Sequence, residues 1–498
     1  MKTIAGILAA AFCLGVGPVK AQTDSVVFAT DNADQPVKTA CIDLKRAYYS
    51  FSVLPDRQQI ALKYVTPREG KASHEGAYVM LDMTSGQELW TAPAAFTQSE
   101  FYQRLGKATE NKQFLDKFQL TTAGLLAAVP DGKLRLLGDS GHVKWEKKFY
   151  PLYVNERHDV VIGYRSVMTG KLRGLRLSTG EELWTTSVLH QNNWGWDDFK
   201  LVSDSMLMVA ADNIYFVNIN NGHTIKYDAS MGHVDTGAVL GQVLGGIAMG
   251  MTFGVFITAN YGAYVPYVGG NMITRTCSNI VQGDHRYYIS DHERIACFDA
   301  TGECLWATPF PDKEGALAGL YLQGDTLYLK NYGVGLRGGI NYKKTGQPFF
   351  ATYDAKDGHV LSFKALPHLK KALGKMPTRI LTDSVFTFQD MDSRLTPLCS
   401  DKDQSVMATD KGRFLVVDRD LKTVNSYSAG NYYGIYQRYG DYMLAGVNDE
   451  GVHDFWIVNK QGEPRLHITR PIQCVDLQGN MLYMLSENHL LMVDMSKL

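Results

Sequence analysis

The chain has 498 residues, of which 45% are hydrophobic and 20% charged, and its formal net charge at pH 7 is -1. A chain of this composition can form a packed core, and it has no overall charge that would attract nucleic acid or an anionic membrane. Its 47 glycines against 16 prolines exclude collagen-like and proline-rich architectures and favour many tight turns.

The N-terminus, residues 1–21, is expected to be a signal peptide. A basic start is followed by an apolar run from Ile4 to Val16, which is too short to span a bilayer. The large Phe12 before Cys13 argues against a lipid-modified cysteine. We therefore expect residues 22–498 to be exported, to be periplasmic or associated with the outer membrane, and not to be a lipoprotein.

The next feature along the chain is a repeated turn. Four segments align without gaps on a glycine followed four residues later by a tryptophan, and each comes after a short apolar run. They are Gly86 with Trp90, Gly141 with Trp145, Gly180 with Trp184, and Gly302 with Trp306. A polar residue, a glycine able to adopt positive φ and flanking strands predict a β-hairpin. The tryptophan on the outgoing strand is expected to pack against the neighbouring unit.

Weaker copies of the turn extend the repeat. They lack the tryptophan around Gly222, Gly358 and Gly462, lack the glycine at residues 417–420, and are truncated at residues 493–496. Where the copies are cleanest, they recur about every 40 residues, which is the length of a four-stranded unit.

The pattern resembles the PQQ-type (quinoprotein-like) propeller repeat, in which an Asp-x-x-Thr-Gly turn precedes a tryptophan on the outer strand. We therefore expect an all-β chain with a single β-propeller of four-stranded blades over residues 22–498. Nine repeat-like signals occur, and the resemblance implies eight blades as the usual closure, so we expect eight blades with an uncertainty of one. An array of two-sheet sandwiches is the alternative. Because the last copy stops before its outgoing strand, Ser25 to Thr30 is expected to supply that strand and close the ring.

Two polar insertions break the period. Residues 97–118 are rich in Glu, Lys, Gln and Leu, and they are expected to form a short amphipathic helix on a blade surface. Asn331 to Gly346 is rich in Gly, Lys and Tyr, and it is expected to be a long loop.

The third insertion, residues 229–276, contains a stretch without any charged residue from Thr236 to Thr274. Its glycines recur four residues apart on two tracks. These are Gly237, Gly241 and Gly245, and Gly246, Gly250 and Gly254. Such spacing lines one face of a helix and allows close packing on another surface. A single membrane crossing conflicts with a closed ring, so we expect a hairpin that contacts a membrane, a partner or the ring. Two buried strands with a glycine-rich loop are the alternative.

Cysteine usage bears on both redox state and catalysis. Cys297 and Cys304 flank a turn and could form a disulfide across a hairpin, the alternative being two free buried thiols. The resemblance raises a quinone-dependent dehydrogenase, a class that carries two adjacent cysteines at its cofactor. No two cysteines are adjacent here. We therefore predict no PQQ or other cofactor, no metal site and no catalytic residue.

Two further segments mimic catalytic sites. Ser140 stands in a Gly-Asp-Ser-Gly run like that of a serine protease, but the repeat already explains it as a turn residue. His285 and His292, with Asp284 and Asp291, could meet across a strand and a turn. The alternative for these four residues is ordinary surface polarity.

Trp194 and Trp196 lie in a run of amides and carboxylates, where flat rings could stack on a sugar. Because the two tryptophans also alternate along one strand face, packing inside a blade is the alternative. The sequence as a whole predicts an exported, non-enzymatic propeller that binds a protein partner or a membrane surface, similar to scaffold-type members of the PQQ-repeat family. A glycan-binding or enzymatic propeller is the competing hypothesis, and no nucleic-acid partner is expected.

Overall fold

The computed structural model describes part of the chain. The described residues are 20–21, 29–31, 35–37, 39–48, 50–66, 73–97, 118–129, 132–165, 170–189, 196–229, 231, 233–234, 272–274, 276–311, 315–331, 333–337, 341–344, 346–365, 388–389, 394–400, 404–409, 413–418, 423–428, 435–439, 442–449, 452–459, 464–468, 472 and 474–497. Lys20 and Ala21 of the expected signal peptide are among them, whereas residues 98–117 of the expected helical insertion lie outside them.

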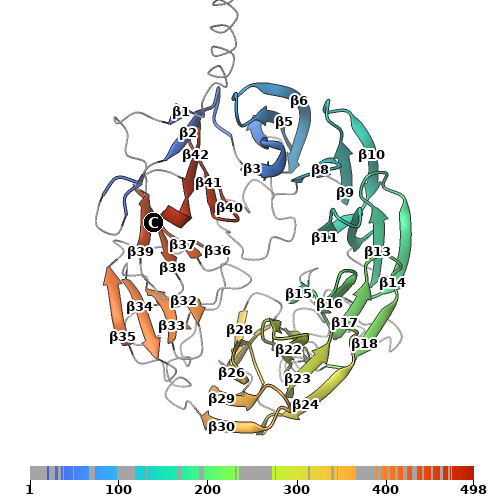
Figure 1. Ribbon diagram of the computed structural model, residues 1–498, viewed down its shortest axis with the longest axis vertical. Helices are drawn as coiled ribbons and strands as arrows, with labels where there is room; N and C mark the ends of the chain where they lie inside the picture. The colour runs from blue at the N-terminus through green and yellow to red at the C-terminus, as the bar shows by residue number, and fades with distance from the viewer. Residues whose placement is uncertain are drawn as a thin grey trace, which may run out of the picture.

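The described strands form ten antiparallel sheets, and nine of these follow one another around a common centre in chain order (Figure 1). The first four consist of β3 (Ser50–Leu54), β4 (Gln59–Thr66), β5 (Ser73–Asp82) and β6 (Glu88–Thr97); β7 (Phe118–Thr121), β8 (Gly124–Val129), β9 (Lys133–Leu137) and β10 (Val143–Lys148); β11 (Tyr150–Asn155), β12 (Val160–Tyr164), β13 (Lys171–Arg176) and β14 (Glu182–Ser187); and β15 (Asp198–Leu201), β16 (Met206–Ala210), β17 (Ile214–Asn218) and β18 (Thr224–Tyr227).

The next four blades continue the same plan. They consist of β21 (Val281–Gln282), β22 (Arg286–Ser290), β23 (Arg294–Asp299) and β24 (Cys304–Pro309); β25 (Ala318–Gln323), β26 (Thr326–Asn331), β29 (Phe349–Asp354) and β30 (Val360–Ala365); β32 (Arg394–Ser400), β33 (Gln404–Thr409), β34 (Arg413–Asp418) and β35 (Thr423–Ser428), with β31 (Phe388–Gln389) beside β32; and β36 (Ile435–Tyr439), β37 (Tyr442–Asp449), β38 (Val452–Asn459) and β39 (Pro464–Ile468).

The expected all-β propeller of four-stranded blades is therefore confirmed. Including the closing sheet described below, nine blade-like sheets occur among the described residues, within one of the expected eight. Burial follows the position of a strand in its blade. The middle strands β12 and β16 are buried along nearly their whole length, because both faces of a blade pack on neighbouring blades. The outer strand β24 instead alternates between half-buried and exposed side chains.

The two ends of the chain meet in the ninth sheet, which contains β40 (Cys474–Gln478), β41 (Met481–Ser486), β42 (His489–Asp494) and β2 (Ala40–Asp43), with β1 (Lys20–Ala21) outside β2. A 3-10 turn, Met495–Lys497, follows β42. Strand β2 lies antiparallel to β42, with Cys41 opposite Leu491. The ring is thus closed by pairing the ends, as expected, but the closing strand is β2 and not Ser25 to Thr30.

Alternating apolar residues explain why Ala40–Asp43 is the closing strand. Cys41 packs into a cluster with Val475 on one side of the blade, and Ile42 packs into a cluster with Tyr483 on the other. Thr30 makes a different contact: its backbone N–H and C=O pair with those of His467 in β39, the outer strand of the preceding blade. Residues 25–28 lie outside the described part of the chain.

The tenth sheet is built from two insertions. It contains β19 (His233–Val234), which precedes the uncharged stretch, β20 (Met272–Thr274), which ends that stretch, and β27 (Val334–Arg337) and β28 (Asn341–Lys344). Strand β20 pairs with β27, with Ile273 opposite Arg337. The segment Asn331 to Gly346 is therefore not the expected irregular loop, since it contains a hairpin. We call this four-stranded unit the insertion sheet.

Candidate functional site

The connections between strands define two faces of the ring. Because neighbouring strands are antiparallel, connections alternate between these faces along each blade. First-to-second and third-to-fourth connections leave the turn face. Second-to-third connections and those leading to the next blade leave the opposite face, which we call the insertion face.

The longest connections all leave the insertion face. Residues 98–117, 228–280 and 366–387 each follow a fourth strand, and residues 332–348 link the second and third strands of one blade. By contrast, the third-to-fourth connection after β5 is limited to residues 83–87. The longest connections between described strands therefore begin and end at one face, and connections of this kind are free to carry function.

Two of these connections are joined by backbone pairing in the insertion sheet. In its β19–β20 hairpin, Val234 lies opposite Met272. The expected contact glycines, Gly237, Gly241, Gly245, Gly246, Gly250 and Gly254, lie between these strands and outside the described residues. The β27–β28 hairpin reaches this unit from a different blade. The insertion sheet therefore anchors both ends of the uncharged stretch to the propeller.

On the turn face, side chains of neighbouring blades contact one another in the first four blades. The Arg57 guanidinium donates to the Thr122 carbonyl at 2.9 Å, and the Thr122 N–H donates to a Glu156 carboxylate oxygen at 2.6 Å. Arg157 forms an ion pair of 2.7 Å with Asp204. These contacts link the first four blades in succession through their first-to-second connections, so this face already serves the packing of the ring.

The repeated glycines and tryptophans also join blades. The indole N–H of Trp145 donates to the Leu177 carbonyl of the next blade at 2.8 Å, and its ring lies beneath the turn at Gly180. Trp184 makes the same contact with the Ile219 carbonyl and with Gly222. Trp90 and Trp306 lie against Gly141 and Gly358 in the same way.

One copy of the contact uses other side chains. Gly302 has Phe216 from the preceding blade beneath it, where the other turns have a tryptophan. Tyr227 on the outer strand of that blade stacks edge-on against Phe298, with ring centroids 4.9 Å apart. Aromatic packing is thus kept although Lys226 stands at the tryptophan position of the repeat.

Trp196, one of the two candidate sugar-binding residues, is 2% exposed. Its indole N–H donates to the Tyr164 hydroxyl at 3.2 Å, and its ring lies edge-on to Phe199. The burial of Tyr164 raises the pKa of its hydroxyl, which stays protonated and donates to the Val188 carbonyl. Trp194 lies outside the described residues.

The serine and histidine candidates occupy turns. The Ser140 hydroxyl lies 2.9 Å from His142 Nδ1 within one exposed hairpin connection. His285 is exposed before β22, whereas His292 follows that strand and has its Nδ1 against the Gly315 carbonyl oxygen. The structure therefore places the two histidines at opposite ends of a five-residue strand and does not bring them together.

Cys297 and Cys304, for which the sequence left a disulfide or two free thiols open, are both free thiols. A bulge shifts the register between β23 and β24, so Cys297 lies opposite Trp306, and Cys304 opposite Phe298. Burial is the main cause that raises the pKa of Cys297, to about 12, and burial also raises the pKa of Cys304. Both sulfurs are therefore neutral thiols at physiological pH.

Two groups of potential metal ligands occur among the described residues. One, Asp354, Asp357 and His359, lies in a third-to-fourth connection, where turn hydrogen bonds account for the carboxylates: Asp357 accepts from the His359 N–H at 3.0 Å. The other, Cys41, Asp43 and His489, joins the two ends of the chain. No sequence pattern pointed to this second group, because nearly the whole chain separates His489 from Cys41 and Asp43.

A small pocket lies between the first two blades on the turn face, and Arg57, Trp90 and Asp139 are among its lining residues. Of these, Trp90 belongs to the repeat contact and Asp139 to the Gly-Asp-Ser-Gly run. Within the described residues, no helix combines the length and the apolar character that a membrane crossing requires.

Comparisons with known proteins concern the fold alone. No model of a protein family matches the chain, and no curated protein matches it. Among solved structures, it is similar to BamB from Moraxella catarrhalis, with 15% identity over 76% of this chain and 95% of that one and a TM-score of 0.39. It is also similar to the C-terminal WD40 domain of Sif2, with 10% identity over 90% and 100% of the two chains and a TM-score of 0.36. A europium-containing methanol dehydrogenase has 9% identity over 85% of each chain and a TM-score of 0.35.

Proposed function

We propose that this chain is an exported, non-enzymatic β-propeller that binds a protein partner in the cell envelope through its insertion face. The observation that carries the proposal is the grouping of the long connections on that face, two of them joined in the insertion sheet. A β-propeller supplies a rigid ring, and loops held by such a scaffold are the usual place for recognition. Export is proposed from the signal-peptide pattern of residues 1–21.

The uncharged stretch is proposed as the main contact. A run from Thr236 to Thr274 without a charged side chain can be desolvated without leaving an unpaired charge. Its anchoring strand β20 pairs with β27 of a hairpin from another blade. A partner bound at this sheet would therefore contact connections from two blades at once. The glycine tracks in this stretch are proposed to allow close approach of the partner's backbone.

The register of the insertion sheet indicates where most of the uncharged stretch can be deleted while its anchoring strands stay paired. Because Val234 and Met272 are cross-strand partners, residues 235–271 can be replaced by an Asn-Gly turn that connects two strands already side by side. We expect this variant to keep the thermal unfolding midpoint of the ring. In crosslinked pull-downs from the envelope fraction of the native organism, it should lose the partner that the unmodified protein recovers.

A matched control changes the opposite face. Asp357→Lys alters an exposed turn-face connection and is expected to leave partner recovery unchanged. Equal recovery by the deletion variant and the unmodified chain would contradict the proposal. Binding of the unmodified chain to lipid vesicles, lost on deletion and without any protein recovered, would instead favour a membrane surface.

A further inference from the structure

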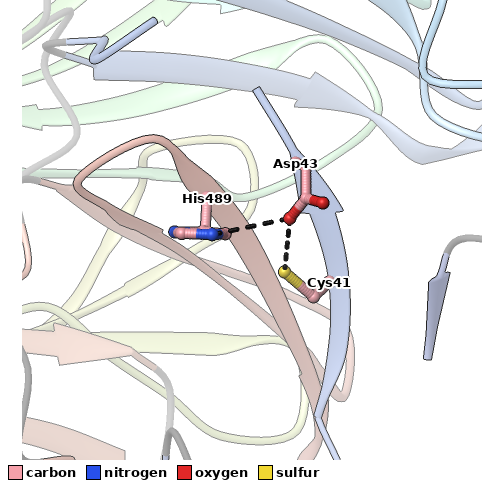
Figure 2. A group of neighbouring side chains, drawn as sticks. All are labelled: Cys41, Asp43 and His489. Carbon is pink, nitrogen blue, oxygen red and sulfur yellow. Dashed lines mark hydrogen bonds and ion pairs between the residues drawn. The ribbon is translucent and has the colours of Figure 1, made fainter. Parts of the chain in front are cut away.

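The seam that closes the ring brings together three different metal-binding side chains. Cys41 and Asp43 lie two residues apart on β2 and therefore on the same face of the strand. His489 begins β42 and is the direct cross-strand partner of Asp43. Figure 2 shows the three side chains close together, with one Asp43 carboxylate oxygen joined by a dashed line to each of the other two.

The ligand atoms lie close to one another, at distances that begin at the spacing a small cation requires and extend somewhat beyond it. Asp43 Oδ1 lies 3.9 Å from Cys41 Sγ and 3.5 Å from His489 Nε2, and one ligand atom from each residue falls within 4.8 Å of the others. Tetrahedral zinc with bonds of about 2.0–2.3 Å separates its ligand atoms by roughly 3.3–3.7 Å. Small side-chain movements toward the centre would therefore complete the coordination.

The surroundings suit an ion that enters from solvent. The Asp43 side chain is 66% exposed and that of His489 is 22% exposed, whereas Cys41 is buried at 3%. A cation could thus approach past the carboxylate and imidazole and reach the sulfur at the inner edge of the site. The backbone around the ligands is fixed, because β2 and β42 are paired along four residues and the Leu44 N–H donates to the Asn488 carbonyl at 2.7 Å.

We propose that Cys41, Asp43 and His489 form a binding site for a thiophilic divalent cation, with Zn²⁺ as the best match. A thiolate, an imidazole and a carboxylate are the three ligand types of protein zinc sites, and the fourth position would hold water. Binding displaces the thiol proton of Cys41 to solvent and leaves the sulfur as a thiolate ligand. The ion then links the first strand of the ring to the last.

The first experiment uses the full chain, freed of metal with a chelator and titrated with Zn²⁺ and Co²⁺. We expect one ion per chain, a thiolate-to-cobalt charge-transfer band, and a rise in the thermal unfolding midpoint with added Zn²⁺ because the ion binds only the closed seam. Cys41→Ser, Asp43→Asn and His489→Gln should each weaken binding by more than about tenfold. Asp43 is exposed, so Asp43→Asn tests the site without disturbing the core.

Two control variants separate this site from other ligands in the chain. Cys474→Ser removes a thiol from the same blade, and Asp357→Ala breaks the other group of potential ligands; both should bind Zn²⁺ as the unmodified chain does. The proposal is overturned if no ion binds at micromolar concentration, if bound Co²⁺ lacks the thiolate band, or if Asp43→Asn and Cys41→Ser keep full affinity.

Discussion

At the residue scale, the contact between a turn glycine and a tryptophan of the preceding blade makes a measurable prediction. Gly180 has a φ of +72°, and a Cβ added there would lie 2.7 Å from the Trp145 ring. Gly180→Ala should therefore cost about 2–4 kcal/mol, from left-handed backbone strain and overpacking together. Gly324 has a φ of +56° with nothing within 4 Å of such a Cβ, so Gly324→Ala should cost only about 1–2 kcal/mol. Urea unfolding measures both, and equal losses would show that the tryptophan contact is unimportant.

The first turn of the repeat also predicts a pH dependence. Hydrogen bonds to Asp82, chiefly from the Ser85 N–H at 2.7 Å, outweigh burial and hold the pKa of this carboxyl below its usual 3.8. Since the folded-state pKa is the lower one, the stability contributed by Asp82 is present above pH 3.8 and is lost as the pH falls through the folded pKa. Asp82→Asn should narrow the difference between unfolding midpoints at neutral pH and at about pH 3. A change of equal size at both pH values would contradict this origin.

At the element scale, closure of the ring depends on β2 rather than on the residues before it. Removing residues 22–31 deletes the pairing of Thr30 with His467 but keeps β2, so we expect a small decrease in the unfolding midpoint. Extending the truncation through Asp43 removes the outer strand of the closing blade and Ile42 from its core. That variant should unfold at a much lower temperature or fail to fold. Thermal unfolding followed by circular dichroism compares the two, and equal effects would place closure upstream of β2.

Strand β2 also shows which part of the ring closure could be predicted from the sequence and which part could not. The truncated copy at residues 493–496 correctly predicted that an N-terminal strand completes the last blade, because a hairpin turn without its outgoing strand is recognisable by pattern. It could not identify Ala40–Asp43, since a four-residue strand whose alternate side chains both enter cores has no periodicity that distinguishes it from its neighbours. For the same reason, the grouping of Cys41, Asp43 and His489 depends on a pairing that local pattern does not encode.

At the scale of the whole molecule, the spacing of the turns predicted a ring. The pairing of two insertions could be recognised only in the folded structure. Asn331 to Gly346 and the uncharged stretch looked like separate interruptions of the repeat, and strand pairing between β20 and β27 unites them. Strand order then assigns them to one face, because connections alternate between faces around the ring. The division between a turn face with short connections and an insertion face with long ones thus follows from the topology and not from any single motif.

This division predicts where a partner can be crosslinked. Within the blade formed by β21–β24, Asp284 lies before β22 on the turn face and Glu293 lies before β23 on the insertion face, so one blade supplies a position on each face. A photo-crosslinking residue at Glu293 should capture the envelope partner, because β20 of the insertion sheet leads directly into this blade, whereas the same residue at Asp284 should capture little. Capture should also disappear from position 293 when residues 235–271 are replaced by a turn. Efficient capture from position 284 alone would move the binding surface to the turn face and contradict the proposed function.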